Sequence, residues 1–146
     1  MYLGRGLVRR VGRVLSSQRR LQPLGVRGER VAARYLKRRG FKIVATGSRD
    51  RLGEVDLIAI DRRTVVFVEV KTRRSTRAGD PLEAVDTEKQ RRLTRVALAF
   101  LRRHDLLEES ARFDVVGIVW PHWARRPAIE HIRGAFEPVG KWQMHA

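Results

Sequence analysis

Two acidic residues and one lysine are spaced in this sequence in a way that suits hydrolysis of a phosphodiester bond. Asp56 lies in the apolar segment 53–61, and Glu69 and Lys71 lie in the next one, 64–71. Mg²⁺ binds one or two carboxylates and keeps several waters, which leaves room for a substrate phosphate. A neighbouring lysine can orient the attacking water and stabilise the negative charge that develops at phosphorus. Asp56 and Glu69 are therefore candidate metal ligands.

The two apolar segments are predicted to be adjacent antiparallel strands joined by a hairpin with its tip at residues 62–63. With this register one face is wholly apolar, because Val55 faces Val70, Leu57 faces Val68 and Ala59 faces Val66. On the other face Ile58 meets Phe67 and Ile60 meets Val65. That face ends with Asp56 opposite Glu69 and Glu54 opposite Lys71. A shift by one residue would mix polar and apolar partners on both faces, so the register is well specified.

Asp56 and Glu69 would be like charges in directly opposed positions, which is destabilising. Such a pair must share a proton, gain a cationic neighbour or bind a divalent metal. The metal interpretation explains the whole set, including Lys71. The residues alone leave one alternative open, a charge cluster at the end of a strand in which Lys71 neutralises the carboxylates.

The rest of the pattern predicts an α/β fold, a mixed sheet of about five strands flanked by helices in the order α-β-β-β-α-β-β. The expected helices are 28–39, stopped by Gly40, and 87–104; the other expected strands are 41–45, 112–120 and 128–132. Thr46-Gly47-Ser48 is expected to end the strand at 41–45. The second helix has two candidate N-caps, Asp80 followed by proline and Asp86, of which the sequence favours Asp86.

Composition limits the classes of protein and of partner. The chain has 146 residues, 32 Lys plus Arg against 16 Asp plus Glu, a net charge of +16 and no cysteine. The absence of cysteine excludes a disulfide scaffold, a thiolate zinc site and a cysteine nucleophile. No apolar run is long enough to span a membrane. The charge favours a polyanionic partner, namely DNA, RNA or an anionic membrane surface, although 27 of the basic residues are arginine, which a coding bias could also produce.

The charge is uneven along the chain, which indicates three regions. Residues 1–27 carry seven arginines and no acidic residue, and the other nine net charges lie on the remainder. We expect a basic, flexible extension at 1–23, a single domain at 24–136 and a C-terminal tail at 137–146. No hydrophobic signal-peptide core is present, and we expect a cytoplasmic protein.

The residues around the candidate site resemble those of a known superfamily. Gly53-Glu54-Val55-Asp56-Leu57-Ile58-Ala59, followed by Phe67-Val68-Glu69-Val70-Lys71-Thr72-Arg73, is similar to the PD-(D/E)xK nucleases. More closely, it resembles the bacterial YraN family of uncharacterised proteins with a restriction-endonuclease-like fold. Further shared features are Gly28-Glu29, Ala32, Tyr35-Leu36, Lys89 and Arg112-Phe113-Asp114. The family usually has asparagine where this chain has Gly47.

The resemblance implies a metal-dependent nuclease that uses Mg²⁺ or Mn²⁺ on DNA or RNA, although the YraN family itself has no established activity. It implies Asp56, Glu69 and the Val70 carbonyl as metal ligands, Lys71 as the catalytic lysine, and Glu29 as an acid that completes the site. A non-catalytic nucleic-acid-binding protein that keeps the fold is the alternative.

Four further residues have both a functional and a structural interpretation. Glu54 either supports the metal ligands or pairs with Lys71. Arg73 and Arg74 are candidate contacts to a nucleic-acid backbone or belong to a solvated loop. Lys89 points at a phosphate or extends from a half-buried helix face. Glu29 itself has a structural alternative, an acid in the first turn of its helix that the helix dipole favours.

Overall fold

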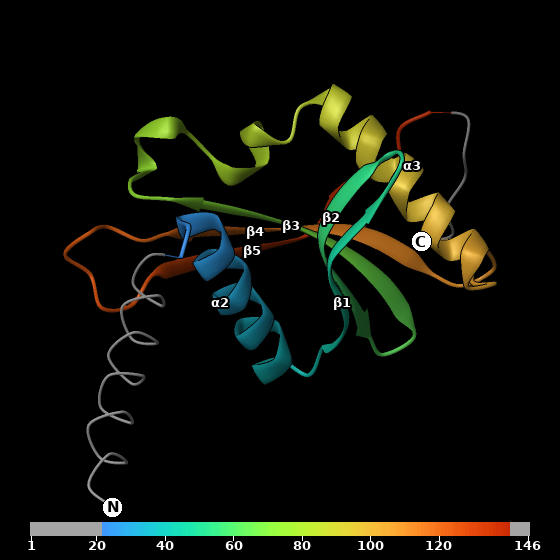
Figure 1. Ribbon diagram of the computed structural model, residues 1–146, viewed down its shortest axis with the longest axis horizontal. Coiled ribbons are helices and arrows are strands. Elements are labelled where there is room, and N and C mark those ends of the chain that lie inside the picture. Colours follow the sequence, from blue (N-terminus) through green and yellow to red (C-terminus); the bar gives the residue numbers. More distant parts are fainter. Residues whose placement is uncertain (1–21, 141–146) are drawn as a thin grey trace, which may run out of the picture.

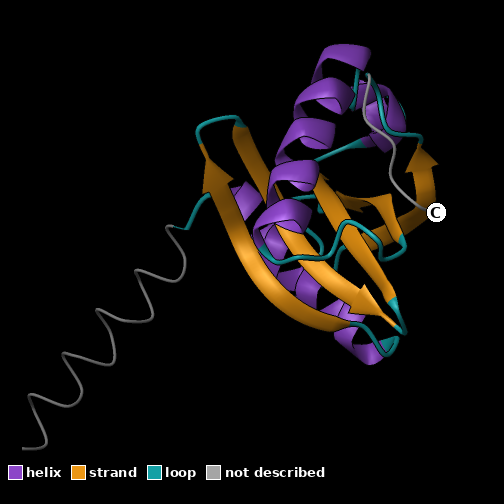
Figure 2. Cartoon of the chain, turned by 90° about the vertical axis from the view of Figure 1, so that its right-hand side faces the viewer, coloured by secondary structure: helices purple, strands orange, loops and turns teal. Residues whose placement is uncertain are grey.

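Two helices pack on opposite faces of a mixed sheet in the part of the chain that the computed structural model describes, residues 22–140 (Figures 1 and 2). The elements are α2 (Leu24–Arg38), β1 (Lys42–Asp50), β2 (Gly53–Asp61), β3 (Thr64–Arg73), the 3₁₀ turns η1 (Thr76–Ala78) and η2 (Pro81–Ala84), α3 (Thr87–Arg103), β4 (Ala111–Val119) and β5 (Ala128–Phe136). The order confirms the predicted α-β-β-β-α-β-β arrangement. The predictions for residues 1–21 and 141–146 lie outside the described residues.

The five strands lie side by side in chain order, β1-β2-β3-β4-β5. β3 and β4 are parallel, because the chain crosses over through α3 between them, and the other neighbouring pairs are antiparallel. No helix within residues 22–140 is long and apolar enough to cross a membrane.

Alternate residues of β3 divide the core into two layers. Val65 and Phe67 pack on the α3 side with Leu93, Val96 and other residues of α3. Val66, Val68 and Val70 pack on the α2 side with Ala32 and Leu36. Successive side chains of a strand point to opposite faces, so Glu69 and Lys71 continue the α3-facing series.

The predicted β2–β3 register is correct from the hairpin tip to the Leu57–Val68 pair. The prediction that β1 ends before Thr46 is wrong, because the strand runs on to Asp50 and pairs with β2 as far as Gly53. A bulge between Ile43 and Ala45 and a left-handed φ of 57° at Gly47 accommodate the turn-forming residues within the ladder.

The other boundaries differ at the ends of elements. α2 begins at Leu24 rather than at Gly28, since Pro23 occupies its N-cap position and accepts a bond from the Arg27 N–H. β5 extends to Phe136, four residues past its predicted end, where its ring stacks on Phe113 at 4.6 Å between centroids. α3 begins after Asp86, as predicted, while Asp80 caps η2.

A buried ion network fastens β4 to β5 and β2 on the α2 side. Asp114, which is fully buried, accepts bonds from Arg112 Nε at 2.9 Å and the Gly134 N–H at 3.0 Å, and its other oxygen lies 2.8 Å from His131 Nε2. Arg112 also binds Asp61 on β2 at 2.9 Å. Burial alone would raise the pKa of Asp114, but His131 and Arg112 hold it below its ordinary value.

Replacing Asp114 with alanine should lower the free energy of unfolding by about 3–5 kcal/mol, because it leaves buried partners uncompensated. Denaturant unfolding near neutral pH measures the loss. Asp105→Asn is the matched control, since Asp105 is exposed with a φ of 57°, a conformation that asparagine tolerates. The control should change stability by less than about 0.5 kcal/mol. Equal losses in the two variants would contradict the role given to Asp114.

Candidate active site

The β2–β3 ladder stops at Leu57–Val68, and beyond this pair the start of β2 stays with β1. The Val70 N–H then donates to Asp56 Oδ2 at 2.8 Å, so a side chain replaces a backbone acceptor. The predicted pairing of Val55 with Val70 is therefore wrong: Val55 packs in the α3-side cluster and Val70 in the α2-side cluster. The separation of the strands leaves space between β2, β3 and α3.

A cavity of about 210 Å³ occupies this space. It is lined by Gly53, Glu54, Asp56, Glu69, Lys89, Arg92, Leu93 and Val96. The carboxylates of Asp56 and Glu69 thus reach one cavity from two strands, although the two residues are not a ladder pair. Lys89 and Arg92, three residues apart on one face of α3, bring positive charge to the opposite wall.

Glu69 is the most buried charged residue of the cavity, with 5% of its surface exposed. Its Oε1 forms ion pairs with the ammonium groups of Lys71, at 3.6 Å, and of Lys89. The backbone of Lys89 is held by the cap of α3, because its N–H donates to Asp86 Oδ1 at 2.8 Å. The helix start therefore determines where Lys89 enters the site.

The pKa of Asp56 departs strongly from its ordinary value. Burial, followed by the negative charge of Glu69, raises the pKa of Asp56 to about 7, while the Val70 N–H acts in the opposite direction. Glu29 adds to the negative field. Burial and the neighbouring acidic side chains thus disfavour the charged form of Asp56, although the ammonium of Lys89 lies in the same cavity.

Glu29 reaches the site because α2 approaches β3 very closely one residue earlier. A Cβ on Gly28 would lie 1.7 Å from Thr72 Oγ1, so only glycine fits there. Burial and the charges of Glu54 and Glu69 raise the pKa of Glu29. Its interpretation as a first-turn acid is wrong, since the helix begins at Leu24 and its first turn holds no acidic residue.

The two lysines differ in their titration. Burial and the neighbouring ammonium of Lys89 hold the pKa of Lys71 below its usual value, against the influence of Glu69. Burial alone would lower the pKa of Lys89, but its contact with Glu69 raises it. Lys71 is thus the more readily deprotonated of the two, and Lys89 is the more firmly charged.

The predicted pairing of Glu54 with Lys71 is wrong. Glu54 Oε2 accepts from Arg49 Nη2 at 2.9 Å across the β1–β2 hairpin, because this end of β2 has turned away from β3. Glu54 still lines the cavity.

Arg73 and Arg74 follow Lys71 at the end of β3. The Arg73 carbonyl accepts a hydrogen bond from the Trp120 N–H, and Arg74 Nη1 donates to the Trp120 carbonyl at 3.1 Å.

Arg92 lines the cavity but was not among the residues predicted from the sequence. It could have been found from Lys89, because residues three apart on a helix lie on the same face. Among the side chains that the structure describes, no three Asp, Glu or His are close enough to one another to hold a metal ion by themselves. The donor set is a carboxylate pair, which suits Mg²⁺ with a partial shell of waters better than Ca²⁺ or Zn²⁺.

Comparison with known proteins gives consistent matches over this region. The model of the uncharacterised protein family UPF0102 matches residues 28–118. A UPF0102 protein of Rhodopirellula baltica is 49% identical over 120 residues, covering 80% of this chain and 72% of that protein. One from Geobacter sulfurreducens is 50% identical over 114 residues, covering 78% and 88%. One from Nocardia farcinica is 46% identical over 115 residues, covering 79% and 90%.

Gly28→Ala should destabilise the protein by about 1–3 kcal/mol through the clash with Thr72, although alanine is the better helix former by about 1 kcal/mol. Gly25→Ala, in the same helix with nothing within 4 Å of the added atom, should be neutral or stabilising. Adding Thr72→Ala to Gly28→Ala removes two of the three clashing atoms and should recover part of the loss. Thermal or denaturant unfolding measures these changes in stability. A stabilising effect of Gly28→Ala would contradict the close approach of Gly28 to Thr72.

In metal-free buffer the wild type should lose stability relative to Asp56→Asn as pH rises from about 4 to about 7. The pKa of Asp56 is about 7 in the folded protein, against about 3.9 in an unfolded chain. The folded state therefore holds a proton that the unfolded state has released, and folding becomes less favourable as the proton is lost. Unfolding at a series of pH values measures the difference; a constant difference would contradict the raised pKa.

Proposed function

The chain belongs to the uncharacterised protein family UPF0102, and we propose that it is a metal-dependent nuclease that hydrolyses phosphodiester bonds in DNA or RNA. The family description names no activity, so the proposal rests on the geometry of the site together with the resemblance of its motifs to PD-(D/E)xK nucleases. The observation that carries it is the convergence of Asp56 and Glu69 in one cavity with Lys71 beside them.

The residues fit a divalent cation. The pKa of Asp56 is raised to about 7 by burial and by the negative charge of Glu69. A structural ion cluster does not need a second buried carboxylate, because burying it costs free energy. A divalent cation between the carboxylates of Asp56 and Glu69 would relieve the repulsion between them. Asp56 and Glu69 are the proposed side-chain ligands, with the Val70 carbonyl implied by the resemblance as a third.

A bound Mg²⁺ or Mn²⁺ would supply Lewis-acid activation of the phosphate and a water of lowered pKa. Lys71 is the proposed catalytic lysine, because its lowered pKa and its position beside Glu69 suit it to orient the attacking water and accept its proton. The Val70 N–H holds Asp56 in place through one oxygen. Glu29 contributes negative charge from α2 and is proposed to complete the site.

Lys89 is proposed to meet the substrate phosphate once Glu69 turns to the metal, since it keeps its positive charge and lines the cavity. Arg73 and Arg74 are proposed to bind the backbone of the nucleic acid beyond the cavity. Their place at the end of β3, two and three residues past Lys71, supports this assignment.

A second candidate function is non-catalytic binding of nucleic acid. One observation favours it: Lys71 and Lys89 both contact Glu69 and already neutralise its charge. In this case the cavity is a structural ion cluster, and the basic surface alone serves the function.

The nuclease proposal predicts that the purified chain cleaves DNA or RNA with Mg²⁺ or Mn²⁺, assayed over single-stranded, duplex and branched substrates. Asp56→Asn and Lys71→Ala should each lower the cleavage rate by at least about a hundredfold, the usual contribution of a group that acts in proton transfer or charge stabilisation. Both variants should retain salt-sensitive binding. Glu109→Gln removes an exposed carboxylate outside the cavity and should cut like the wild type.

A metal titration separates the two candidates. If the chain is a nuclease, Mn²⁺ should raise the melting temperature of the wild type more than that of Asp56→Asn. A chain that binds nucleic acid, cuts nothing and gains no stability from Mn²⁺ is the non-catalytic protein.

A further inference from the structure

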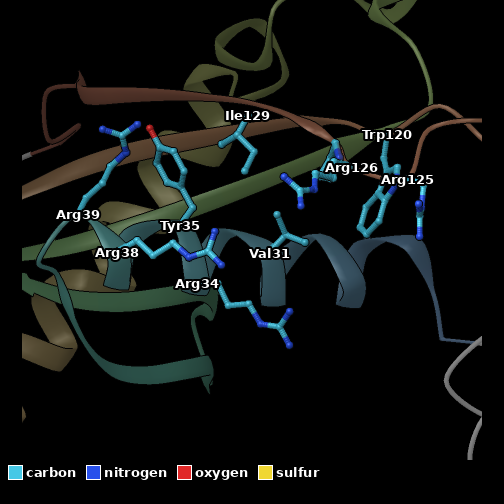
Figure 3. Close-up of a pocket in the computed structure, with 10 residues that line it drawn as sticks. Val31, Arg34, Tyr35, Arg38, Arg39, Trp120, Arg125, Arg126 and Ile129 are labelled. Atoms are coloured by element: carbon cyan, nitrogen blue, oxygen red, sulfur yellow. The ribbon is translucent and has the colours of Figure 1, made fainter.

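A groove lined by arginines runs along α2 on the face of the sheet opposite to α3 (Figure 3). It has a volume of about 730 Å³. Arg34, Arg38 and Arg39 line it from α2 and the residue after it, and Arg125 and Arg126 line it from the loop at 121–127. Of the residues that the structure describes, no acidic one lines this groove.

The arginines of the groove are not paired with carboxylates. Among residues 22–140, Arg49, Arg91, Arg112 and Arg133 form ion pairs, but no ion pair joins any of the five groove arginines to a carboxylate. All five are exposed. Like charges gathered in a concave surface repel one another and raise the local potential, which favours a polyanionic ligand.

Aromatic rings hold two guanidinium groups at the groove. Arg39 lies over the Tyr35 ring at 4.3 Å, and Arg27 lies over the Trp120 ring at 4.3 Å. A guanidinium stacked on a ring keeps its N–H donors at its edge, where they can bind phosphate oxygens. Tyr35 and Trp120 line the groove, so the donors are held beside it before a ligand arrives.

Trp123 lies in the same loop as Arg125 and Arg126, and 86% of its surface is exposed. An exposed indole costs free energy unless a ligand covers it, and a nucleic-acid base can stack on its face. The bases of a duplex are already stacked on one another. An exposed indole two residues before Arg125 in the chain therefore favours an unpaired strand over a duplex.

One end of the groove is linked to the residues that follow Lys71. At one end it includes Trp120, whose backbone is bonded to Arg73 and Arg74. Arg74 lies three residues past Lys71 and one residue beyond the end of β3, about 10 Å away at the usual rise of an extended chain. A strand lying in the groove would leave it beside the catalytic end of β3.

We propose that this groove binds a single strand of nucleic acid, with the arginines on its phosphates and Trp123 stacked on an unpaired base. The inference deepens the proposed function by naming the form and the path of its substrate, and it rests on that function only for the direction of the path. An anionic membrane also attracts arginine and tryptophan, but a bilayer surface does not enter a concave groove.

The test is binding of a fluorescent oligothymidylate to the full chain in EDTA, followed by anisotropy over a series of salt concentrations. Arg34→Ala combined with Arg38→Ala should reduce the slope of log K against log salt by about 1.4, about 0.7 for each lost phosphate contact. Trp123→Ala should weaken binding about tenfold, which corresponds to one stacked base. The matched control is Arg95→Ala with Arg103→Ala, which removes two exposed arginines from α3 and should have little effect.

Three results would overturn the inference: equal losses in the groove and control pairs, equal affinity for a matched duplex, or binding only to vesicles that contain phosphatidylglycerol. Because the assay contains no metal, it does not depend on hydrolysis. If the protein cuts no nucleic acid but binds the oligonucleotide as expected, the nuclease proposal is contradicted and the groove proposal is supported. If it cuts nucleic acid and the groove variant binds with unchanged affinity, only the groove proposal is contradicted.

Discussion

The separation of β2 from β3 beyond the Leu57–Val68 pair is the constraint on which the candidate site depends. Where the two strands are paired, apolar side chains cover both faces of the hairpin, and they leave no space for a substrate or a metal ion. Where they separate, Asp56 binds the backbone of Val70 and a cavity opens toward α3. The cost of burying carboxylates there is offset by lysines on β3 and α3.

Acidic and basic side chains are concentrated in different parts of the molecule. Acidic groups from α2, β2 and β3 gather around one small cavity, while unpaired arginines line a separate groove on the α2 face. A basic groove attracts a polyanion, and a carboxylate pair with a lysine beside it suits a metal-assisted attack on phosphate. Trp120, at one end of the groove, is bonded to Arg74, three residues past Lys71, and this link is the basis for proposing a single path.

The buried network around Asp114 has a different task from the candidate site, although both contain acidic and basic groups. Asp114 has a cation or a backbone donor on each oxygen, and its pKa is held below the ordinary value. Asp56 has one backbone donor and faces other acids, and its pKa is raised. Full compensation is typical of a structural cluster, whereas a carboxyl group whose pKa is raised by burial and by a second acid is more typical of a functional site.

The sequence by itself determined the central hairpin and its register as far as the Leu57–Val68 pair, because alternation of apolar residues along neighbouring segments is a local property. It indicated Asp56 and Glu69 as candidate site residues. It also indicated Asp86 as the helix cap that positions Lys89. It could not show where the hairpin separates, that Glu54 turns to Arg49, or that Gly28 brings Glu29 to the site. Those outcomes depend on contacts between elements far apart in the chain, which only the tertiary structure decides.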